Sequence, residues 1–342
     1  MLLTLLLITI LISFAFTLFL EKFFLKYSIF IDEPNARSSH RKPVPTSGGL
    51  AILCSYFIFI YLLGIYITID SDIFLILIIA ISPIIIIGLI DDFKKVNILL
   101  RLFTQFFTAS LIIYYFQVSN DIFYADSYAR QSALLIISLS VILSMWLMNL
   151  YNFMDGIDGY ASLECIFISL AASLLAYNNN PNSYIYIYLA GLGAANLGFL
   201  VRNWHPAKIF MGDTGSVSLG CIIAFYIFFS ASESILSIYT WLILLSIFIV
   251  DASYTLLVRI VTKKNIVQPH LTHAFHLITI KKNSHLFTIK WMTIINIIWV
   301  FPLALLSNTY MSYHIVITMI AYLPLLFYLI KIGAGLEQNK NL

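Results

Sequence analysis

Carboxylate side chains stand beside glycines at three places in a sequence that otherwise carries few charges. Asp91 and Asp92 are adjacent in the stretch GLIDDFKKVN, and Asp213 lies between two glycines in FMGDTG. Adjacent carboxylates repel each other unless a cation offsets them, and such pairs suit proton abstraction or metal binding. A carboxylate among glycines beside a helix N-terminus can hold Mg²⁺ while nearby amides face phosphate oxygens. Each feature alone also has a simpler interpretation: the pair could end an apolar helix, and Asp213 could cap one.

The third place is the stretch NLYNFMDGIDGY at 149–160, which lies between two long apolar runs. Residues three positions apart project from neighbouring positions on a helix, and the glycines that follow let the backbone approach a ligand. A structural helix end needs at most one capping side chain, so four polar groups favour a binding or catalytic role. These four residues are Asn149, Asn152, Asp155 and Asp158.

Basic side chains accompany the carboxylates. The stretch QPHLTHAFHLI sets His270, His273 and His276 at intervals of three. Three histidines suggest zinc, but no Cys or acid accompanies them in their loop, and binding of an anionic substrate is favoured. The stretch DEPNARSSHRKPVPTSGG adds Arg37 and His40. Carboxylates for a metal or a proton, with cations for phosphates, are the groups that phosphoryl transfer requires.

The elements that must position these groups are membrane helices. Of 342 residues, 61% are hydrophobic and 10% are charged, which excludes an ordinary soluble domain. Apolar runs of about 17 to 24 residues recur along the chain, and each is long enough to cross a bilayer as a helix. The sequence predicts an all-α, polytopic membrane bundle of 11 spans in a single integral-membrane domain, 1–342. The spans are expected near 2–20, 49–69, 73–90, 98–116, 132–149, 160–177, 183–201, 214–230, 235–258, 289–307 and 312–330.

The distribution of Lys and Arg predicts the orientation of the chain. All 19 of these residues except Arg130 lie in or beside one alternate set of loops, and such loops face the cytoplasm. This predicts a periplasmic N-terminus and a cytoplasmic C-terminus, and it explains the net charge of +3 without a nucleic-acid partner. The motifs above fall on the same side. The predicted cytoplasmic active-site loops are 21–48, 91–97, 150–159, 202–213 and 259–288.

Taken in order, the motifs resemble those of the polyprenyl-phosphate N-acetylhexosamine-1-phosphate transferases of glycosyltransferase family 4. This family includes undecaprenyl-phosphate GlcNAc-1-phosphate transferases and is related to phospho-N-acetylmuramoyl-pentapeptide transferase. The resemblance covers five blocks over most of the chain. The blocks are Asp32-x-Pro34-Asn35-x-Arg37 with His40; Asp91-Asp92 with Arg101 and Gln105; Asn149 through Gly159; Asn203 through Gly220; and Asp251 onward to His270 and His273.

The resemblance implies roles for individual residues. Asp91 and Asp92 match the catalytic pair, and Asp213 with Asn152 matches a Mg²⁺ site, in which Mn²⁺ could substitute. Phe210 matches an aromatic residue that stacks on uracil. The other residues expected to contact nucleotide, sugar or phosphate are Asn149, Asp155, Asp158, His270, His273, Arg37 and His40.

The resemblance also implies a reaction. The expected donor is UDP-GlcNAc or a deoxy-amino relative such as UDP-FucNAc or UDP-QuiNAc, the acceptor is undecaprenyl phosphate, and UMP is released. The expected place is the bacterial inner membrane, where the product starts O-antigen or another cell-envelope glycan; a homodimer is compatible with this role. The sequence leaves open which of Asp91 and Asp92 is the base, and whether a covalent intermediate forms.

The alternative is a transporter of a phosphorylated or anionic solute. Transporters usually place ionisable groups near the bilayer midplane. The nearest candidates, Glu164 and Asp251, lie within about seven residues of a predicted cytoplasmic helix end. The polar motifs therefore favour the transferase.

Overall fold

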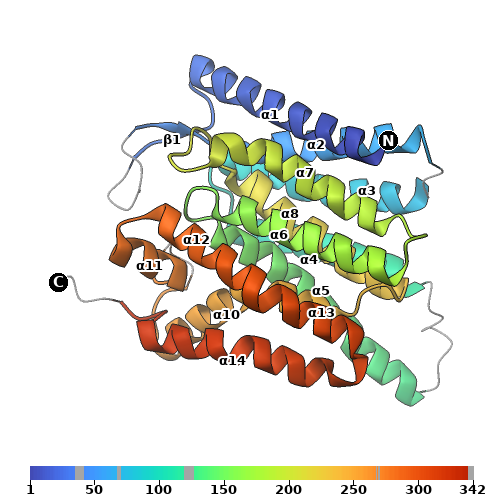
Figure 1. The fold of residues 1–342 in the computed structure, drawn as a ribbon. Helices are drawn as coiled ribbons and strands as arrows, with labels where there is room; N and C mark the ends of the chain where they lie inside the picture. The colour runs from blue at the N-terminus through green and yellow to red at the C-terminus, as the bar shows by residue number, and fades with distance from the viewer. Residues whose placement is uncertain (35–41, 68–70, 119–126, 267, 269, 338–342) are drawn as a thin grey trace. The chain divides into compact units, whose positions relative to one another are not determined.

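The structure is a computed structural model that describes residues 1–34, 42–67, 71–118, 127–266, 268 and 270–337. The chain forms two compact units, 1–235 and 236–342, and each is described here by itself. In both units the regular structure is almost entirely α-helical (Figure 1).

The first unit contains eight helices and one short antiparallel strand pair among the described residues. The strands pair Ile31 with Pro45 and Asp32 with Val44. In chain order the elements are α1 (Leu2–Tyr27), β1 (Ile31–Asp32), β2 (Val44–Pro45), α2 (Gly49–Gly64), α3 (Ser71–Phe93), α4 (Ile98–Val118), α5 (Ser127–Met154), α6 (Tyr160–Asn179), α7 (Ile185–Asn203) and α8 (Gly212–Ser232).

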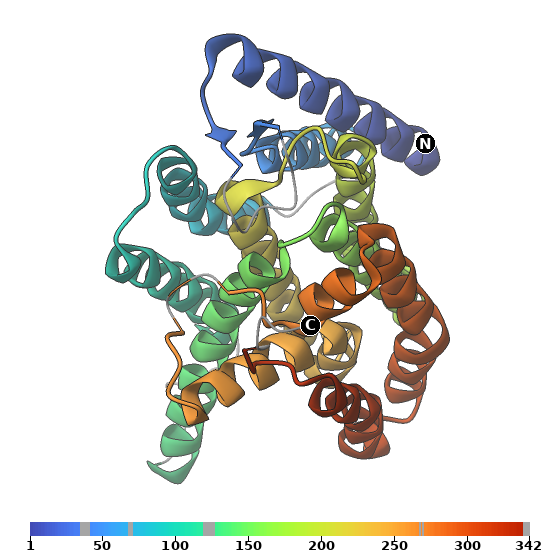
Figure 2. The same ribbon diagram turned by 90° about the vertical axis from the view of Figure 1, so that its left-hand side faces the viewer.

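Helix α8 is the core of this unit. It packs against α2, α3, α4 and α5, and nearly all of its residues are buried. A helix that is apolar on every side can be stable only when neighbouring helices cover it. Figure 2 shows α8 in yellow with these helices around it, while α7 packs against α1, α2 and α6. The N-terminus of α8 is therefore fixed by several neighbours at once, and this end carries Asp213.

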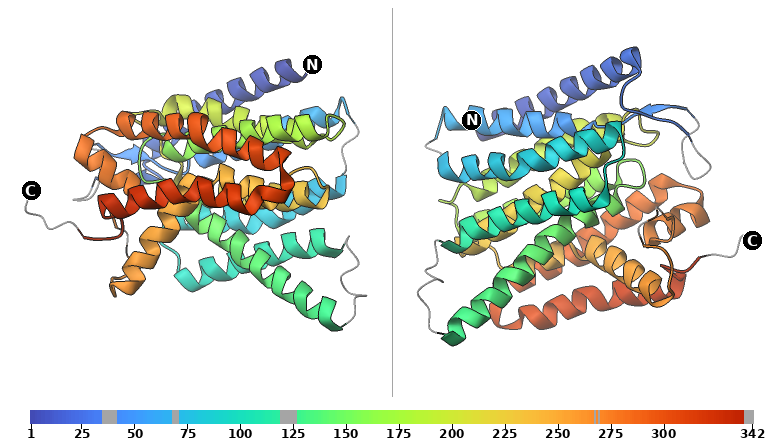
Figure 3. Two further views of the ribbon diagram at one scale, coloured as in Figure 1. Left: turned by 60° about the horizontal axis from the view of Figure 1, so that its bottom comes forward. Right: turned by 180° about the vertical axis from the view of Figure 1, so that it is seen from behind.

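The second unit is built from helices that follow one another through short breaks, except for the longer connection 262–273 (Figure 3). The axes of its first two helices are bent by 77°. A π-helical segment at Asn296–Val300 joins the fourth and fifth helices into one span, His285–Thr309. In chain order the helices are α9 (Ile238–Leu244), α10 (Ser246–Val261), α11 (Ala274–Lys282), α12 (His285–Ile295), α13 (Phe301–Thr309) and α14 (His314–Ile332).

The protein is a polytopic all-α membrane protein, as the sequence predicted. Among the described residues, nine helices are long and apolar enough to span a bilayer, and the bent pair α9 and α10 makes a tenth. Helix α2 has 16 residues, a length of about 24 Å, which is shorter than the hydrocarbon core of about 30 Å. Each of the eleven predicted runs contains a helix, but α2 is shorter than expected and the run at 235–258 is broken. The number of true spans and the sides on which the termini lie stay predictions.

Several hydroxyl groups inside the helices are satisfied by the preceding turn of the same helix. Thr9 donates to the Leu5 carbonyl at 2.8 Å and Ser55 donates to the Ala51 carbonyl at 2.7 Å. Such bonds to the preceding turn remove the cost of an unpaired hydroxyl in an apolar environment. Polar side chains within the spans thus need no functional explanation when they form bonds of this kind.

Candidate active site

The segment before α8 is held to the segment before α2 by backbone hydrogen bonds. The Phe210 N–H donates to the Pro45 carbonyl at 2.8 Å, and the Gly48 N–H donates to the Phe210 carbonyl at 2.9 Å. The two helices then meet so closely that a Cβ on Gly49 would lie 2.1 Å from the Gly215 Cα. Only glycine allows this approach. The start of α8 is therefore fixed by main-chain contacts.

Gly212 makes the turn into α8 and also leaves room for a carboxylate. Its φ of +75° lies in the left-handed region that favours glycine. A Cβ at this position would lie 2.6 Å from Asp92 Oδ2 and 2.7 Å from the Ser47 nitrogen. The glycine before Asp213 is thus required both by the backbone conformation and by the approach of Asp92.

Asp92, at the end of α3, caps the N-terminus of α8. Its Oδ1 accepts the backbone N–H of Asp213 at 2.8 Å, and its Oδ2 accepts the Thr214 N–H at 3.2 Å and the Thr214 hydroxyl at 2.7 Å. The Ser47 hydroxyl donates to Oδ2 at 2.7 Å. The first N–H groups of a helix lack intrahelical acceptors, and a carboxylate there also complements the helix dipole. The sequence offered Asp213 as a simple helix cap; the structure gives that role to Asp92.

Asp91 has a different environment from its neighbour. Its Oδ1 accepts the backbone N–H of Val96 at 2.6 Å, and its Oδ2 pairs with Arg101 Nη1 at 3.0 Å. An ionised carboxylate has about four acceptor positions. Asp91 therefore keeps acceptor capacity that Asp92 has given to the start of α8.

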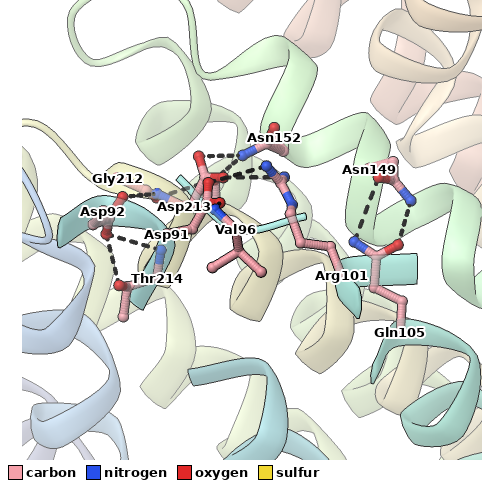
Figure 4. A network of polar contacts seen from close by, with 11 residues as sticks. Asp91, Asp92, Val96, Arg101, Gln105, Asn149, Asn152, Gly212, Asp213 and Thr214 are labelled. Carbon is pink, nitrogen blue, oxygen red and sulfur yellow. Dashed lines mark hydrogen bonds and ion pairs between the residues drawn. The ribbon is translucent and has the colours of Figure 1, made fainter. Parts of the chain in front are cut away.

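Arg101, on α4, joins Asp91 to Asp213. Its Nη2 lies 3.0 Å from Asp213 Oδ2 while its Nη1 contacts Asp91. The other oxygen of Asp213 accepts the Asn152 side-chain amide at 2.7 Å, and Asn152 also donates to the Ser216 hydroxyl at 3.2 Å. Figure 4 shows these contacts as one network. Four helices, α3, α4, α5 and α8, each contribute a side chain to it.

A small pocket of about 10 Å³ opens beside this network. Asp91, Arg101 and Asp213 form its polar side. Its other wall is apolar and comes from the transmembrane parts of α3 and α8. The residues of this wall are Ile84, Ile87, Gly88 and Val217, with Gln105 beside them.

Asp155 and Asp158 lie beyond the last helical residue of α5, in the loop that leads to α6. Burial raises the pKa of Asp155 well above its ordinary value, and the nearby carboxylates of Asp213, Asp92 and Asp158 raise it further. Asp158 accepts the Ala207 N–H at 3.1 Å, and its Oδ2 lies 2.6 Å from His205 Nδ1. Asp158 thus links this loop to the one that leads into α8, while Asp155 adds a further carboxyl group near Asp213.

Two other predicted residues, Asn149 and Phe210, lie near this network. The Asn149 amide donates to Gln105 Oε1 at 2.7 Å and to the Met145 carbonyl at 2.8 Å. This pair ties α5 to α4, apart from the carboxylates in Figure 4. Phe210 is partly exposed just before the turn at Gly212. Their contacts with a nucleotide stay predictions.

The three histidines of the QPHLTHAFHLI stretch, His270, His273 and His276, belong to the second unit. Asp251 caps α11 by accepting the N–H groups of Ala274 at 2.9 Å and Phe275 at 3.2 Å, and its Oδ1 lies 3.3 Å from His273 Nδ1. The rings of His270 and His273 stack with centroids 5.0 Å apart. Burial and the neighbouring His273 lower the pKa of His270 to about 4, so that side chain is neutral near pH 7.

Two predicted residues have no described position in the structure, and three residues that the sequence did not single out contact the carboxylates. Arg37 and His40 lie outside the described residues. Ser47, Thr214 and His205 were not singled out from the sequence, although each contacts a predicted carboxylate. Ser47 and Thr214 stand next to the glycines of PTSGG and GDTG, and this proximity is the signal that could have identified them.

Comparison with known proteins finds a matching family model and several similar transferases. Residues 74–231 match the family model described as glycosyl transferase family 4. The chain is 28% identical over 310 residues to a Bacillus subtilis (strain 168) protein named "Probable undecaprenyl-phosphate N-acetylglucosaminyl 1-phosphate transferase", covering 86% of this chain and 83% of the relative. It is also similar to phospho-N-acetylmuramoyl-pentapeptide-transferases. That of Halalkalibacterium halodurans is 32% identical over 255 residues, 68% of this chain and 77% of the relative. That of Kosmotoga olearia is 37% identical over 150 residues, 40% of this chain and 46% of the relative.

Proposed function

Because the chain belongs to glycosyl transferase family 4, and is a membrane-bound polyprenyl-phosphate hexosamine-1-phosphate transferase, we propose its substrates and its site. The donor is a UDP-N-acetylhexosamine, either UDP-GlcNAc or a deoxy-amino relative such as UDP-FucNAc or UDP-QuiNAc. The acceptor is undecaprenyl phosphate, and the other product is UMP. The reaction takes place at the cytoplasmic face of the bacterial inner membrane and starts O-antigen or another envelope glycan.

One observation supports this proposal most directly. Asp91, Arg101 and Asp213 converge on a pocket whose opposite wall is made by apolar residues of transmembrane helices. A lipid phosphate needs such a boundary, because its chain must stay in an apolar environment while its phosphate meets polar groups. A water-soluble acceptor would need no apolar wall. The meeting of charged and apolar side chains therefore supports a polyprenyl phosphate as the acceptor, although the pocket itself, at about 10 Å³, has room for only about one water molecule.

The proposed reaction forms one P–O bond and breaks another. An oxygen of the lipid phosphate attacks the sugar-linked β-phosphorus of the UDP-sugar. The bond between that phosphorus and the oxygen bridging it to the α-phosphorus breaks, and this oxygen leaves with UMP. A proton on the lipid phosphate passes to a carboxylate. Correct placement of the reacting atoms supplies much of the acceleration in such transfers.

We assign the proton acceptor to Asp91. The oxygens of Asp91 each have one donor among the hydrogen bonds given above, and its side chain borders the pocket. The carboxylate of Asp92 accepts four hydrogen bonds from Ser47, Asp213 and Thr214. Asp92 is then a positioning residue, because it fixes the first turn of α8 and with it the direction of the Asp213 side chain.

Arg101 supplies the positive charge of the site. Its guanidinium has five N–H donors in a planar fork. It already contacts two carboxylates, and the same fork matches the oxygens of a phosphate. Arg101 therefore orients the lipid phosphate beside Asp91.

Three side chains near the start of α8, from α8 itself and from the end of α5 and the loop after it, fit a divalent cation. Asp213, Asn152 and Asp155 offer oxygen ligands of the kind that Mg²⁺ prefers. Burial, and then the neighbouring carboxylates, raise the pKa of Asp155, and a cation would offset the repulsion among these carboxylates. Asp213 with Asn152 would hold Mg²⁺, or Mn²⁺ in its place. When bound, the ion would neutralise charge on the diphosphate as UMP leaves.

The remaining assignments concern the nucleotide and the sugar. Phe210 precedes the turn at Gly212, and its ring would stack on uracil while Asp213 holds the metal. His270 would contact the diphosphate or sugar as a neutral hydrogen-bonding group, since its pKa is lowered to about 4. We keep Arg37 and His40 as proposed anion contacts from the sequence alone.

The test is an assay of UMP release by the purified full-length protein. It contains Mg²⁺, undecaprenyl phosphate and one UDP-sugar from a panel, and the lipid product is identified by mass. We expect release of UMP with at least one UDP-N-acetylhexosamine, and none when the lipid phosphate or Mg²⁺ is left out. A sugar nucleotide with another base as the sole donor would contradict the uracil contact. Binding or uptake of sugar nucleotides without UMP release would favour the transporter.

A further inference from the structure

A second cavity lies wholly within the second unit. It has a volume of about 410 Å³ and is enclosed by α11, α12 and α14. This size is within the range of about 300–1,000 Å³ that small-molecule sites occupy. The lining residues are Leu277, Ile278, Lys281, Lys282, Phe287, Trp291, Tyr328, Lys331 and Ile332.

The charge of this cavity is entirely positive. Lys281 and Lys282 end α11, and Lys331 lies in the last turn of α14. The sequence contains no Asp or Glu between positions 252 and 336, so no acidic side chain of these helices can neutralise the three ammonium groups. The cavity is therefore complementary to an anion.

The cavity also has an apolar side, which lies at the ends of two candidate membrane spans. Its walls are the beginning of α12 and the end of α14, which are the ends of two candidate spans. Phe287, Trp291 and Tyr328 are each more than a third exposed, and Lys282 Nζ lies 5.0 Å from the centre of the Phe287 ring. Trp and Tyr favour the boundary between headgroups and acyl chains, and basic pockets between helices at this level suit phosphate headgroups.

We propose that this cavity binds the headgroup of an anionic membrane phospholipid. Lys281, Lys282 and Lys331 contact its phosphate, and its first acyl-chain carbons lie on Trp291 and Tyr328. A free phosphate would leave the aromatic wall without a partner. None of the described residues that line the cavity carries a carboxylate that could take a proton, so we assign its lipid as a bound lipid of the surrounding bilayer and not as a reactant. The inference is independent of the proposed sugar donor.

The first measurement is lipid retention by the purified full-length protein in native mass spectrometry. Phosphatidylglycerol and phosphatidylcholine with the same acyl chains are added in equal amounts. We expect preferential retention of phosphatidylglycerol. A basic residue near the surface contributes about a fivefold gain in affinity for an anionic lipid, so each single Lys→Gln variant should weaken retention by about that factor. The triple variant Lys281→Gln/Lys282→Gln/Lys331→Gln should lose the preference.

Two variants control for folding and for overall charge. The triple Lys→Arg variant at 281, 282 and 331 keeps the charge and should keep the preference. The variant Lys22→Gln/Lys26→Gln/Lys263→Gln removes three exposed charges outside the cavity and should also keep it. An equal loss in this control and in the cavity variant would overturn the proposal, because general electrostatics would then explain retention.

The second measurement locates the lipid. A phosphatidylglycerol with a photoreactive group beside its headgroup should label peptides within 277–291 or 328–332. Labelling only elsewhere would overturn the proposal, as would equal labelling by the phosphatidylcholine analogue. Displacement by undecaprenyl phosphate at a lower concentration than by phosphatidylglycerol would show a site for the lipid substrate instead. Displacement by millimolar inorganic phosphate would show a simple anion site.

Discussion

The carboxylate of Asp92 and the backbone of Asp213 are directly bonded, because the Asp213 N–H donates to Asp92 Oδ1 at 2.8 Å. The first residue is at the end of α3 and the second is in the first turn of α8. The bond makes the direction of the Asp213 side chain dependent on Asp92. Asp92 thus fixes the start of α8, while Asp91 lines the pocket beside it.

Substitution of the two neighbours should separate these roles. Loss of a helix-capping side chain costs about 0.5–2 kcal/mol, so Asp92→Ala should lower the free energy of unfolding by about that amount and raise the Mg²⁺ concentration needed for turnover. Asp91→Asn should lower turnover by about 10²–10⁴-fold, the usual contribution of a general base. Its unfolding free energy should fall by at most about 1 kcal/mol, through loss of the ion pair with Arg101, and its Mg²⁺ requirement should stay near that of the wild type. Turnover and chemical unfolding are measured on both variants at matched purity, and full stability of Asp92→Ala would contradict the capping role.

Gly212→Ala should damage the site through its geometry. The backbone at this position has a φ of +75°, which alanine disfavours, and the new Cβ would lie 2.6 Å from Asp92 Oδ2. We expect a loss of about 1 kcal/mol or more in unfolding free energy and a large loss of turnover. Gly333→Ala is the matched control, because φ is +74° there and the nearest atom to a Cβ is Leu336 Cδ1 at 3.9 Å. The control should lose stability and keep turnover, and parallel losses in both variants would argue against crowding of Asp92.

Arg101→Gln should make stability depend on Mg²⁺. The change leaves Asp91 and Asp213 without the cation that joins them, at a cost on the order of 1 kcal/mol for partly exposed pairs. A divalent cation at Asp213 should restore this loss. Arg202→Gln breaks the pair with Glu21, in which the contacts are 2.7 Å, and Mg²⁺ should not restore its stability. The measurement is unfolding with and without Mg²⁺, and equal recovery of both variants would contradict a cation site at Asp213.

Phe210→Ala should weaken binding of the UDP-sugar by about 1–2 kcal/mol, the scale of stacking between a base and an aromatic ring. The backbone at this position is held by Pro45 and Gly48, so the loop should persist without the ring. Affinity for the lipid phosphate should therefore stay nearly unchanged. Titrations with each substrate measure the two affinities, and equal losses would point to collapse of the loop.

His276 should make the folded protein less stable in acid. Burial, and then the neighbouring His273, lower its pKa from 6.5 to about 3. The unfolded chain then binds more protons than the folded chain below pH 6.5, so the unfolding free energy falls as the pH falls. Between pH 6.5 and 5 this loss is up to about 2 kcal/mol. Unfolding of the wild type and of His276→Gln at pH 7.5, 6.5 and 5 should show a smaller pH dependence in the variant. Identical slopes would remove His276 as their source.

Hydropathy and charge were sufficient to predict the class of fold. Apolar runs of bilayer length can only be helices in lipid, and each predicted run contains one in the structure. The break at Leu245, between α9 and α10, was not predictable because neither proline nor glycine marks it. The shortness of α2 was also hidden, because the apolar sequence continues past Gly64.

Residue type and spacing indicated which polar side chains lie together, but not how they contact one another. Asp91, Asp92, Asp213 and Asn152 do meet, as the motifs indicated (Figure 4). A sequence does not show that the end of α3 meets the start of α8, and so it could not distinguish Asp91 from Asp92. The same limit applies to Asn149, whose partner Gln105 is 44 positions away. Long-range packing decides which polar side chains remain available to a substrate.

The hydrogen bonds that hold Phe210 have a consequence for how this enzyme can evolve. They involve only the main-chain atoms of Pro45, Gly48 and Phe210, so they survive any change of side chain at 210 other than to proline. If Phe210 stacks on the base as proposed, substitutions there would change the preferred nucleotide base while the Asp213 carboxylate, three residues further on, keeps its position. On this proposal, donor choice and catalytic chemistry would be altered by separate mutations, and a new donor specificity would not have to pass through an inactive intermediate.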